Sequence, residues 1–447
     1  MRMGEIDIIT LGCSKNLVDA ERLMRQLELV GYKCVHDAAT PNGEIAIINT
    51  CGFIGDAKEE SIDIILRFAE RKTKGKLKRL YVMGCLSQRY AKELPTEIPE
   101  VDGWYGKFDY LGIVEEVRRL GDKAMRQEAR GKEYERKLTT PKHYAYLKIA
   151  EGCNRYCSYC AIPLITGKFT SRPIEEILDE VRWLVGEGVK EFNVIAQDLS
   201  SYGLDLYGEH RLAQLIDEMA QIAGVEWIRL HYTYPTDFPY DLLPVMAKHP
   251  NICKYMDIAL QHCSDHMLQK MHRHITREEQ DAVIARIRKE VPGICIRTTL
   301  LVGHPGETET DFNELCEWVK EMKFERMGAF AYSEEEGTFA ARHYKDEIPQ
   351  EEKERRVETL MAIQQGISAE LLSQMVGTKQ RIVIDRVEEE YYVGRTQYDS
   401  PEVDCEVLIE KEAIRREGDE AMKRMEIGEY YTVNIIKSED FDLYATL

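Results

Sequence analysis

Residues 144–160 read Tyr-Ala-Tyr-Leu-Lys-Ile-Ala-Glu-Gly-Cys-Asn-Arg-Tyr-Cys-Ser-Tyr-Cys, an apparent strand that leads into three closely spaced cysteines, Cys153, Cys157 and Cys160. The spacing C-x3-C-x2-C brings three thiolates to one loop and supplies no fourth. Because a [4Fe–4S] cubane takes four ligands, these three would leave one iron open. The stretch therefore predicts an iron–sulfur cluster with a free coordination site, held in a loop after a strand.

An open iron of this kind can chelate the amino and carboxylate groups of S-adenosylmethionine, and reduction of the sulfonium then yields a 5′-deoxyadenosyl radical. The motif resembles that of the radical-SAM superfamily. On this resemblance Cys153, Cys157 and Cys160 are the catalytic residues and the ligands of the radical-generating cluster. The residues alone leave one alternative open, a zinc site of three thiolates completed by a remote histidine.

A second set of three cysteines, Cys13, Cys51 and Cys85, is dispersed in the sequence, but each of them ends a short apolar run. Helical patterns separate the runs, so the segment reads βαβαβ with a parallel sheet. The carboxyl ends of parallel strands lie along one edge of a sheet, where ligands bind. We therefore expect these cysteines to converge and to hold a second cubane with an open iron; three buried structural cysteines are the alternative.

The chain has 447 residues, 44% of them hydrophobic, and a formal net charge of −19. This length predicts roughly three domains. The negative charge disfavours broad contact with nucleic-acid backbones, which bind clustered Lys and Arg. Lacking an apolar stretch long enough for a bilayer, the chain is expected in the cytoplasm, with reduced thiols and no membrane partner. The other cysteines are expected in hydrophobic cores: Cys34, Cys253, Cys263, Cys295, Cys316 and Cys405.

Strand and helix patterns alternate from Tyr144 to about Met375 and predict a (β/α) barrel of six strands, open on one side. The expected fold class is α/β, with an N-terminal doubly wound parallel sheet, this central open (β/α)6 barrel and a small C-terminal antiparallel β-barrel like an OB fold. We place the domains at residues 1–120, 143–376 and 377–447. The mixed-charge segment 121–142 between the first two is interpreted as a solvated linker; contact of its basic residues with ribosomal RNA or with an acidic neighbour is the alternative.

Several residues near predicted strand ends have groups suited to binding S-adenosylmethionine. A glutamine can hydrogen-bond ribose or methionine groups, a glycine turn lets backbone approach the adenine, and an aromatic ring can pack on it. Two arginines on barrel strands need anionic partners. The predicted cofactor-binding residues are Tyr159, Gln197, Arg229, Arg297, Gly303 and Glu307. For the arginines an ion pair with a neighbouring Glu, and for Tyr159 a plain packing role, are the alternatives.

The C-terminal segment shows short strand patterns separated by turns. From Gly377 to Leu447 it contains 10 Lys plus Arg and 18 Asp plus Glu, a net charge of −8. Such a surface should repel phosphate and attract a basic partner. The histidine-rich stretch from Gln261 to His274 has no known ligand spacing, and we interpret it as a loop that leads into a helix.

These features together resemble the radical-SAM methylthiotransferases over nearly the whole chain, and the C-terminal barrel resembles a TRAM domain. Residues Thr10-Leu-Gly-Cys-Ser-Lys-Asn-Leu-Val-Asp19, Ile195-Ala-Gln-Asp198 and Ser400-Pro-Glu-Val-Asp404 are similar to the RimO type, which modifies an aspartate of a small-subunit ribosomal protein. The resemblance implies S-adenosylmethionine and two [4Fe–4S] clusters as cofactors. In this assignment Cys13, Cys51 and Cys85 hold the auxiliary cluster.

The resemblance also implies a two-stage reaction. One S-adenosylmethionine methylates sulfur carried by the auxiliary cluster, and the radical from a second removes hydrogen from the aspartate β-carbon, which then receives the methylthio group. The expected partners are a basic small-subunit ribosomal protein, possibly within the ribosome, and a reductant such as flavodoxin or ferredoxin.

Two other functions are kept as alternatives. A tRNA adenosine methylthiotransferase has the same architecture, but the acidic C-terminal barrel argues against tRNA as a partner. A non-catalytic iron–sulfur electron-transfer protein would not need open irons. The chain departs from the family pattern at His304, where phenylalanine is usual, at Thr166, where the residue is often basic, and at Cys405, where glycine is usual.

Overall fold

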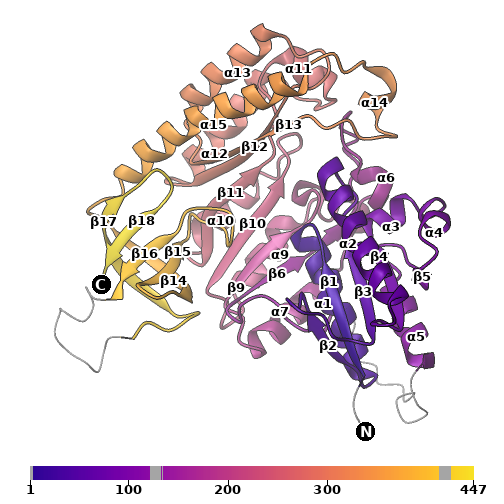
Figure 1. The fold of residues 1–447 in the computed structure, drawn as a ribbon. Helices are drawn as coiled ribbons and strands as arrows, with labels where there is room; N and C mark the ends of the chain where they lie inside the picture. The colour runs from indigo at the N-terminus through magenta and orange to yellow at the C-terminus, as the bar shows by residue number, and fades with distance from the viewer. Residues whose placement is uncertain (1–3, 121–131, 133, 412–423) are drawn as a thin grey trace.

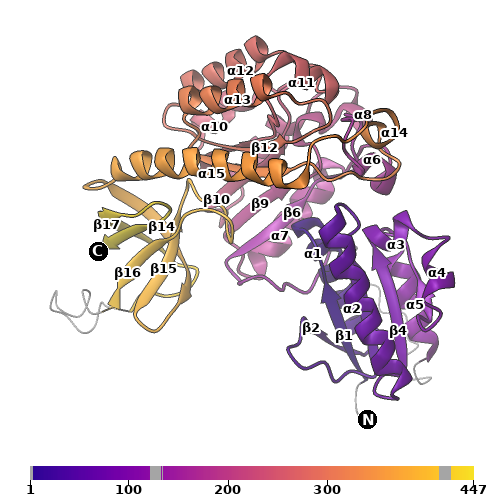
Figure 2. The same ribbon diagram turned by 45° about the horizontal axis from the view of Figure 1, so that its top comes forward.

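The computed structural model describes residues 4–120, 132, 134–411 and 424–447, which form three units (Figure 1). An N-terminal α/β domain and a C-terminal β-barrel lie apart from each other, each beside the central unit (Figure 2). The long helix α15 (Gln350–Ser373) runs along the central unit and leads into the C-terminal barrel. Within the described ranges, no helix has both the length and the apolar character needed to cross a bilayer.

The N-terminal domain is a five-stranded parallel sheet in the order β2-β1-β3-β4-β5. Its strands are β1 (Glu5–Thr10), β2 (Lys33–His36), β3 (Ile45–Thr50), β4 (Arg79–Gly84) and β5 (Gly103–Trp104). Its helices are α1 (Ser14–Leu29), α2 (Gly55–Thr73), α3 (Cys85–Arg89), α4 (Leu94–Glu97) and α5 (Tyr110–Leu120). The predicted βαβαβ order and parallel sheet are confirmed. The edge strands β2 and β5 are additional, and both are too short to give a clear pattern.

The central strand β3 explains why this sheet is stable. Alternate residues of β3 pack into two different cores. Ile45 and Ile47 lie in the core on the side of α1 and α5. Ala46 and Ile48 lie in the core on the side of α2. All six residues of β3 are buried. A parallel sheet covered on both faces reads as a continuous apolar run, which is the pattern of this strand.

The central unit is a six-stranded parallel sheet in the order β13-β12-β11-β10-β9-β6, open between its two edge strands. Its strands are β6 (Tyr144–Lys148), β9 (Glu191–Ile195), β10 (Trp227–Thr233), β11 (Ile252–Ile258), β12 (Cys295–Val302) and β13 (Arg326–Ala331). The main covering helices are α7 (Ile174–Gly186), α9 (Leu212–Ala220), α10 (Leu242–Lys248), α12 (Arg277–Glu290) and α13 (Glu309–Met322). The predicted open barrel of six strands is confirmed.

Shorter elements surround the carboxyl ends of these strands. They are β7 (Ala150–Glu151), β8 (Thr170–Ser171), α6 (Ile162–Thr166), the 3-10 turn Leu199–Ser201, α8 (Leu204–Tyr207), α11 (Asp265–Lys270) and α14 (Phe339–His343). They shape the mouth of the open barrel, where the motif cysteines lie.

The C-terminal unit is a closed barrel in the order β14-β15-β16-β18-β17. Its strands are β14 (Lys379–Val387), β15 (Tyr391–Thr396), β16 (Val407–Glu410), β17 (Tyr430–Ser438) and β18 (Leu443–Thr446). The predicted small β-barrel is confirmed, with β18 as an additional strand that pairs parallel to β16 and antiparallel to β17. Cys405 is buried in its core, and the other cysteines outside the two sets are also buried, as predicted.

This barrel is attached at the amino-terminal ends of the central strands. Glu191, the first residue of β9, accepts from Arg395 at 2.6 Å, and Arg326, the first residue of β13, donates to Asp399. His143, just before β6, lies 2.8 Å from Asp385. Several of the acidic residues counted in the C-terminal segment are therefore used to hold it in place, so the net charge of −8 overstates its free acidic surface.

The interpretation of residues 121–142 as a solvated linker needs correction. Residues 121–131 and 133 lie outside the described part, but Arg136 is buried and Lys137 binds Glu28 at 2.5 Å. Arg136 contacts Glu21 of α1 and Glu180 of α7 at 2.9 and 3.3 Å. Burial of this arginine requires anionic partners, and these come from both flanking domains. The end of the segment therefore fastens the N-terminal domain to the barrel.

Glu180 is the central carboxylate of this interdomain contact. Its carboxylate lies 3.2 Å from Arg22 and 2.7 Å from Arg172, in addition to Arg136. Burial would raise the pKa of Glu180, but the cations, Arg172 foremost, lower it to about 2. The interdomain contact is therefore held by a carboxylate that stays ionised.

We predict that Glu180→Gln destabilises the protein by about 3–5 kcal/mol, because it leaves buried arginines without their anion. Urea unfolding measures this, with Glu176→Gln as control, since Glu176 binds Arg172 at 2.8 Å but is 41% exposed. The pKa of Glu180 is depressed from 4.5 to about 2, so its contribution is present above pH 4.5 and is lost as pH falls toward 2. Equal effects of the two variants would contradict this assignment.

Candidate active site between two cysteine sets

The loop of Cys153, Cys157 and Cys160 is held at the mouth of the barrel by backbone contacts. Gly152 has a φ of +79°, and a Cβ there would lie 2.2 Å from a backbone carbonyl, so only glycine fits this turn. The amide of Cys153 donates to the carbonyl of Gly167 at 3.3 Å, and that of Cys160 donates to the carbonyl of Cys157 at 3.1 Å. The thiols therefore lie on a short, well-supported turn.

A buried arginine that sequence reasoning missed faces this loop. Nη1 of Arg273 lies 3.3 Å from Sγ of Cys157, and its guanidinium lies 4.0 Å from the ring centroid of Tyr234. Burial raises the pKa of Cys153 to about 12 and also raises that of Cys160. Arg273 opposes the rise at Cys160, and Arg155 opposes it at Cys153, so the neighbouring cations favour thiolates over thiols. The only sequence signal was the position of Arg273 within the histidine-rich stretch.

The second cysteine set converges as predicted. Cys51 and Cys85 directly follow β3 and β4, which pair residue for residue up to their last positions. Cys13 lies on the turn after β1, where a Cβ at Gly12 would stand 3.0 Å from Sγ of Cys51. The parallel register therefore brings three dispersed cysteines to one edge of the sheet.

Asn16, also missed by sequence reasoning, organises this edge. Its amide donates to the carbonyls of Leu11 and Thr50, both at 3.0 Å. Its Oδ1 accepts from Sγ of Cys85 at 3.6 Å. One buried asparagine thus links three neighbouring strand ends, because its amide offers two donors and an acceptor.

Two lysines make this edge electropositive. Burial would raise the pKa of Cys13, but Lys15 and Lys107 lower it below the usual value. Burial raises the pKa of Cys85 to about 12 against the opposing effect of Lys107. Cationic surroundings of this kind suit thiolate ligands.

The donor chemistry of both sets fits an iron–sulfur cluster. Across the described residues, no group of three or more His, Cys, Asp or Glu side chains is placed to hold a single metal ion. The thiolates of a cubane bind different irons and therefore stand farther apart than ligands that share one ion. Each set offers three cysteines at one site, which suits a cubane with one iron open to another ligand.

A polar bridge connects the two sets on the β6 side of the barrel. Glu151, which precedes the Cys153 loop, accepts from Lys107 of the N-terminal domain at 3.0 Å and from Gln197 at 2.9 Å. Lys148 binds both Glu151 and Asp19 of α1. The same residues therefore contact both cysteine edges and determine how the N-terminal domain faces the barrel mouth.

A second bridge lies on the β13 side. The carboxylate of Glu335, only 3% exposed, binds Lys58 and Arg89 of the N-terminal domain, both at 2.8 Å. Arg89 ends the helix that begins at Cys85 and also donates to the carbonyl of Gly52 at 2.9 Å. The N-terminal domain is therefore attached to both edge strands and spans the open side of the barrel.

The segment after Glu335 continues to the other cysteine loop. The amide of Ala340 donates at 2.7 Å to the carbonyl of Ser158, which lies between Cys157 and Cys160. One short segment thus connects both cysteine sets. Its geometry determines their relative position.

We predict that Glu335→Gln weakens this attachment by about 3–5 kcal/mol, since the Arg89 side chain, only 6% exposed, and the partly exposed Lys58 both lose their anion. Hydrogen exchange of residues 85–89 and 333–340 should accelerate while the barrel core stays protected. Glu334→Gln is the matched control, because Glu334 is exposed. Unchanged exchange in Glu335→Gln would show that this bridge does not position the domain.

Two of the predicted cofactor-binding residues lie near the cysteine loop. Gln197 follows β9 and contacts Glu151, while its Oε1 is buried without a hydrogen-bond partner in the described residues. Tyr159 lies within the loop itself, and its ring meets the edge of His304 with a centroid separation of 6.2 Å. These two remain proposed contacts for S-adenosylmethionine.

The arginines Arg229 and Arg297 require a correction. Arg229 binds Glu191 at 3.2 Å and donates to the carbonyl of Gln397 in the C-terminal barrel at 2.7 Å. Arg297 lies 3.5 and 3.4 Å from Asp257 and Asp404. Both occupy the amino-terminal halves of their strands, away from the carboxyl-end mouth. The alternative of ion pairs with neighbouring carboxylates is the better interpretation, because these contacts attach the C-terminal barrel.

Gly303 and Glu307 form a structural turn. Gly303 has a φ of +73° and its would-be Cβ lies 2.3 Å from the stem of Lys353 on α15. Its amide donates to Glu307, which is buried and also binds His262 and Arg356 at 3.1 and 2.8 Å. The carboxylate of Glu307 is thus occupied by protein donors, so the prediction that it binds cofactor directly is not supported.

His304, the departure from the family pattern, is buried in this turn. Its Nε2 is hydrogen-bonded to Oγ of Ser158 at 3.1 Å. Burial lowers the pKa of His304 to about 4, so the ring is neutral near pH 7 and packs as an aromatic residue would. Thr166 ends α6 and donates to the carbonyl of Ile162 at 3.0 Å.

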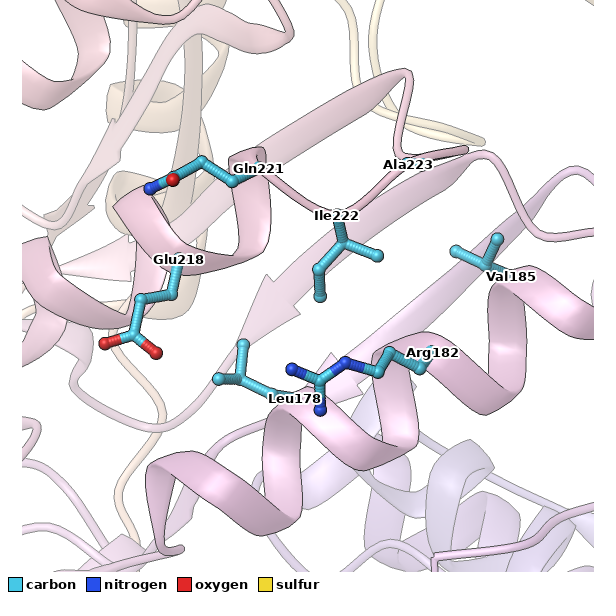
Figure 3. A pocket seen from close by; sticks show the side chains of 7 residues that line it. All are labelled: Leu178, Arg182, Val185, Glu218, Gln221, Ile222 and Ala223. Atoms are coloured by element: carbon cyan, nitrogen blue, oxygen red, sulfur yellow. The ribbon is translucent and has the colours of Figure 1, made fainter.

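A groove of about 520 Å³ on the outer face of the barrel lies between α7 and α9 (Figure 3). It is lined by Leu178, Arg182, Val185, Glu218, Gln221, Ile222 and Ala223. None of these residues comes from the barrel mouth or from either cysteine set. This groove therefore has no evident part in the chemistry.

The chain matches three family models and several relatives along its full length. Residues 147–319 match the Radical SAM superfamily, residues 5–106 the Uncharacterized protein family UPF0004, and residues 376–447 the TRAM domain. A protein of Bacteroides fragilis named ribosomal protein uS12 methylthiotransferase RimO is 61% identical, with both chains covered completely. The chain belongs to the RimO family of radical-SAM methylthiotransferases. Its cofactors are therefore S-adenosylmethionine and [4Fe–4S] clusters.

Further family members and solved structures agree. Proteins of the same name from Bacteroides thetaiotaomicron and Porphyromonas gingivalis are 59% and 55% identical, and each match covers 100% of this chain and at least 99% of the relative. The radical S-adenosylmethionine methyltransferase TsrM from Kitasatospora setae has a TM-score of 0.54 at 13% identity and covers 88% of this chain and 80% of that one. At this identity the likeness concerns the fold alone.

Proposed function

We propose that this chain attaches a methylthio group to the β-carbon of an aspartate in ribosomal protein uS12. The observation that carries the proposal is the presence of two three-cysteine sets in neighbouring domains, linked by the contacts of Glu151 and Glu335. The full-length relatives are named for uS12. Transfer of both sulfur and carbon needs two sites close together, which this arrangement provides.

The residues of the chain have distinct parts in this reaction. When bound, the cofactors supply the radical and the methylated sulfur. Cys153, Cys157 and Cys160 hold the site of radical generation, and Arg273 supplies positive charge beside it. Cys13, Cys51 and Cys85 hold the sulfur-carrying site. The two bridges hold these sites in register, so that a substrate carbon placed between them can meet both.

The proposal also includes an electron donor and a cellular location. A low-potential reductant such as flavodoxin or ferredoxin would supply electrons. Because the substrate is a ribosomal protein, free or in the ribosome, we place the reaction in the cytoplasm.

The deciding experiment is mass spectrometry of uS12 and of tRNA from cells with and without this gene. We expect the mass of one methylthio group to be missing from an aspartate of uS12 in cells that lack the gene, while tRNA is unchanged. Loss from a tRNA adenosine instead would assign the chain to the tRNA-modifying alternative.

The C-terminal barrel gives a further prediction about recognition. Beyond the acidic residues that hold the barrel in place, exposed ones remain, including Glu389, Glu390, Glu410 and Glu426. We expect the full-length protein to bind basic uS12 more tightly than tRNA, and more weakly as salt rises, since exposed charges are screened beyond about 10 Å at 0.1 M. Titrations at two ionic strengths test this. Tighter binding of tRNA would contradict it.

A further inference from the structure

Among the described residues, four lysines are buried: Lys15, Lys107, Lys148 and Lys353. Three of them have carboxylate partners, Glu151 for Lys107, Asp19 and Glu151 for Lys148, and Asp346 for Lys353. Lys15 is the exception, because no carboxylate of the described residues lies within ion-pair distance of it. The stem of Lys15 is largely buried, since the residue is 8% exposed, but its Nζ is not among the enclosed side-chain atoms that lack a partner. Besides its effect on the Cys13 thiol, the ammonium therefore keeps a free face that an added carboxylate could occupy.

The surroundings of Lys15 point toward the reaction space. Its Nζ lies 3.6 Å from the ring centroid of Tyr232, a cation–π contact that leaves its N–H donors available for an anion. Tyr232 lies at the carboxyl end of β10, is 37% exposed, and has a φ of +64°. Such a backbone conformation is costly for a bulky residue and is concentrated at functional sites. Lys15 itself is two residues from Cys13. The ammonium thus lies between the N-terminal cysteine edge and the barrel mouth.

We propose that Lys15 binds the side-chain carboxylate of the substrate aspartate, with Tyr232 as the wall of this subsite. This inference rests on the proposed function and specifies the same site. The carboxylate is bonded directly to the β-carbon, so one ion pair at Lys15 positions that carbon between the two cysteine sets. It also selects aspartate over asparagine, because the neutral amide can offer one acceptor oxygen to the ammonium but no negative charge.

A carboxylate at Lys15 has two conceivable sources, the substrate and the methionine part of S-adenosylmethionine. The second is expected at the loop of Cys153, Cys157 and Cys160, where the open iron of the radical site would bind it. Lys15 lies instead beside the sulfur-carrying set. This location favours the substrate.

The test uses full-length holoenzyme and two forms of uS12, the natural protein and one with asparagine at the aspartate that mass spectrometry identifies. We expect the wild-type enzyme to bind the aspartate form about 10–100-fold more tightly, the range of a charge-assisted hydrogen bond. Lys15→Met should bind both forms equally weakly, and Lys15→Arg should restore most of the preference. Lys76→Met, an exposed lysine of the same domain, is the control. Affinity for S-adenosylmethionine should be unchanged in Lys15→Met.

Several results would overturn the inference. Equal binding of both uS12 forms by the wild-type enzyme would do so without any variant, even if Lys15→Met fails to fold. A preference for aspartate that persists in Lys15→Met, with iron content unchanged, would also exclude it. Loss of S-adenosylmethionine binding in Lys15→Met would assign the ammonium to the cofactor. Failure of the proposed function would give a different result from failure of this inference. In that case uS12 from wild-type cells would carry no methylthio group.

Discussion

Replacing Cys153, Cys157 and Cys160 together with alanine should abolish formation of 5′-deoxyadenosine and leave about half of the roughly eight irons expected for two cubanes. The thiolates of this loop are the only protein ligands we assign to the radical site, so their removal leaves nothing to hold the cluster. Anaerobic reconstitution followed by iron analysis and product chromatography measures both effects.

Cys316→Ala is the matched control, because Cys316 is buried in the barrel core outside both sets. It should keep full iron content and full cleavage activity. Zinc in place of iron in anaerobically prepared wild-type protein would contradict the cluster assignment and favour the three-thiolate zinc site instead.

Replacing Cys13, Cys51 and Cys85 with alanine should have the complementary effect. Reductive cleavage of S-adenosylmethionine should continue, while transfer of the methylthio group to protein falls below detection, because this set alone is assigned to carry sulfur. The measurement is the ratio of methylthiolated uS12 to 5′-deoxyadenosine in one reaction.

The matched control for this set is Cys34→Ala, a buried cysteine of the same domain. It should leave the ratio unchanged. A triple variant that still delivers a methylthio group would show that the N-terminal edge is not the sulfur-carrying site.

The convergence of the N-terminal cysteines shows how much sequence pattern can predict. Cys51 and Cys85 each follow an apolar run typical of a buried parallel strand. Since parallel strands end at one edge of a sheet, the pattern alone predicts that these two cysteines lie close together. The register of β3 with β4 confirms this prediction. Asn16 could not be found this way, because its role depends on which carbonyls the turn places beside it.

The barrel arginines show where pattern reasoning fails. Arg229 and Arg297 alternate with core residues along their strands, which indicates that they face the barrel interior. Alternation does not reveal what covers the amino-terminal ends of those strands. In this chain the covering element is the C-terminal barrel, whose contacting residues lie 168 positions after Arg229 and 107 positions after Arg297. Its backbone and carboxylates receive both guanidinium groups.

The sequence by itself determined the three domains' fold types, the two cysteine sets and the chemistry that they imply, because local periodicity and ligand spacing are properties of short segments. Only the tertiary structure decided how these parts face one another. The bridges through Glu151 and Glu335, the buried carboxylate of Glu180 and the contact of Lys15 with Tyr232 all depend on segments that are distant in the sequence. Such contacts form because buried charges must find partners, and a sequence does not state which partner is nearest.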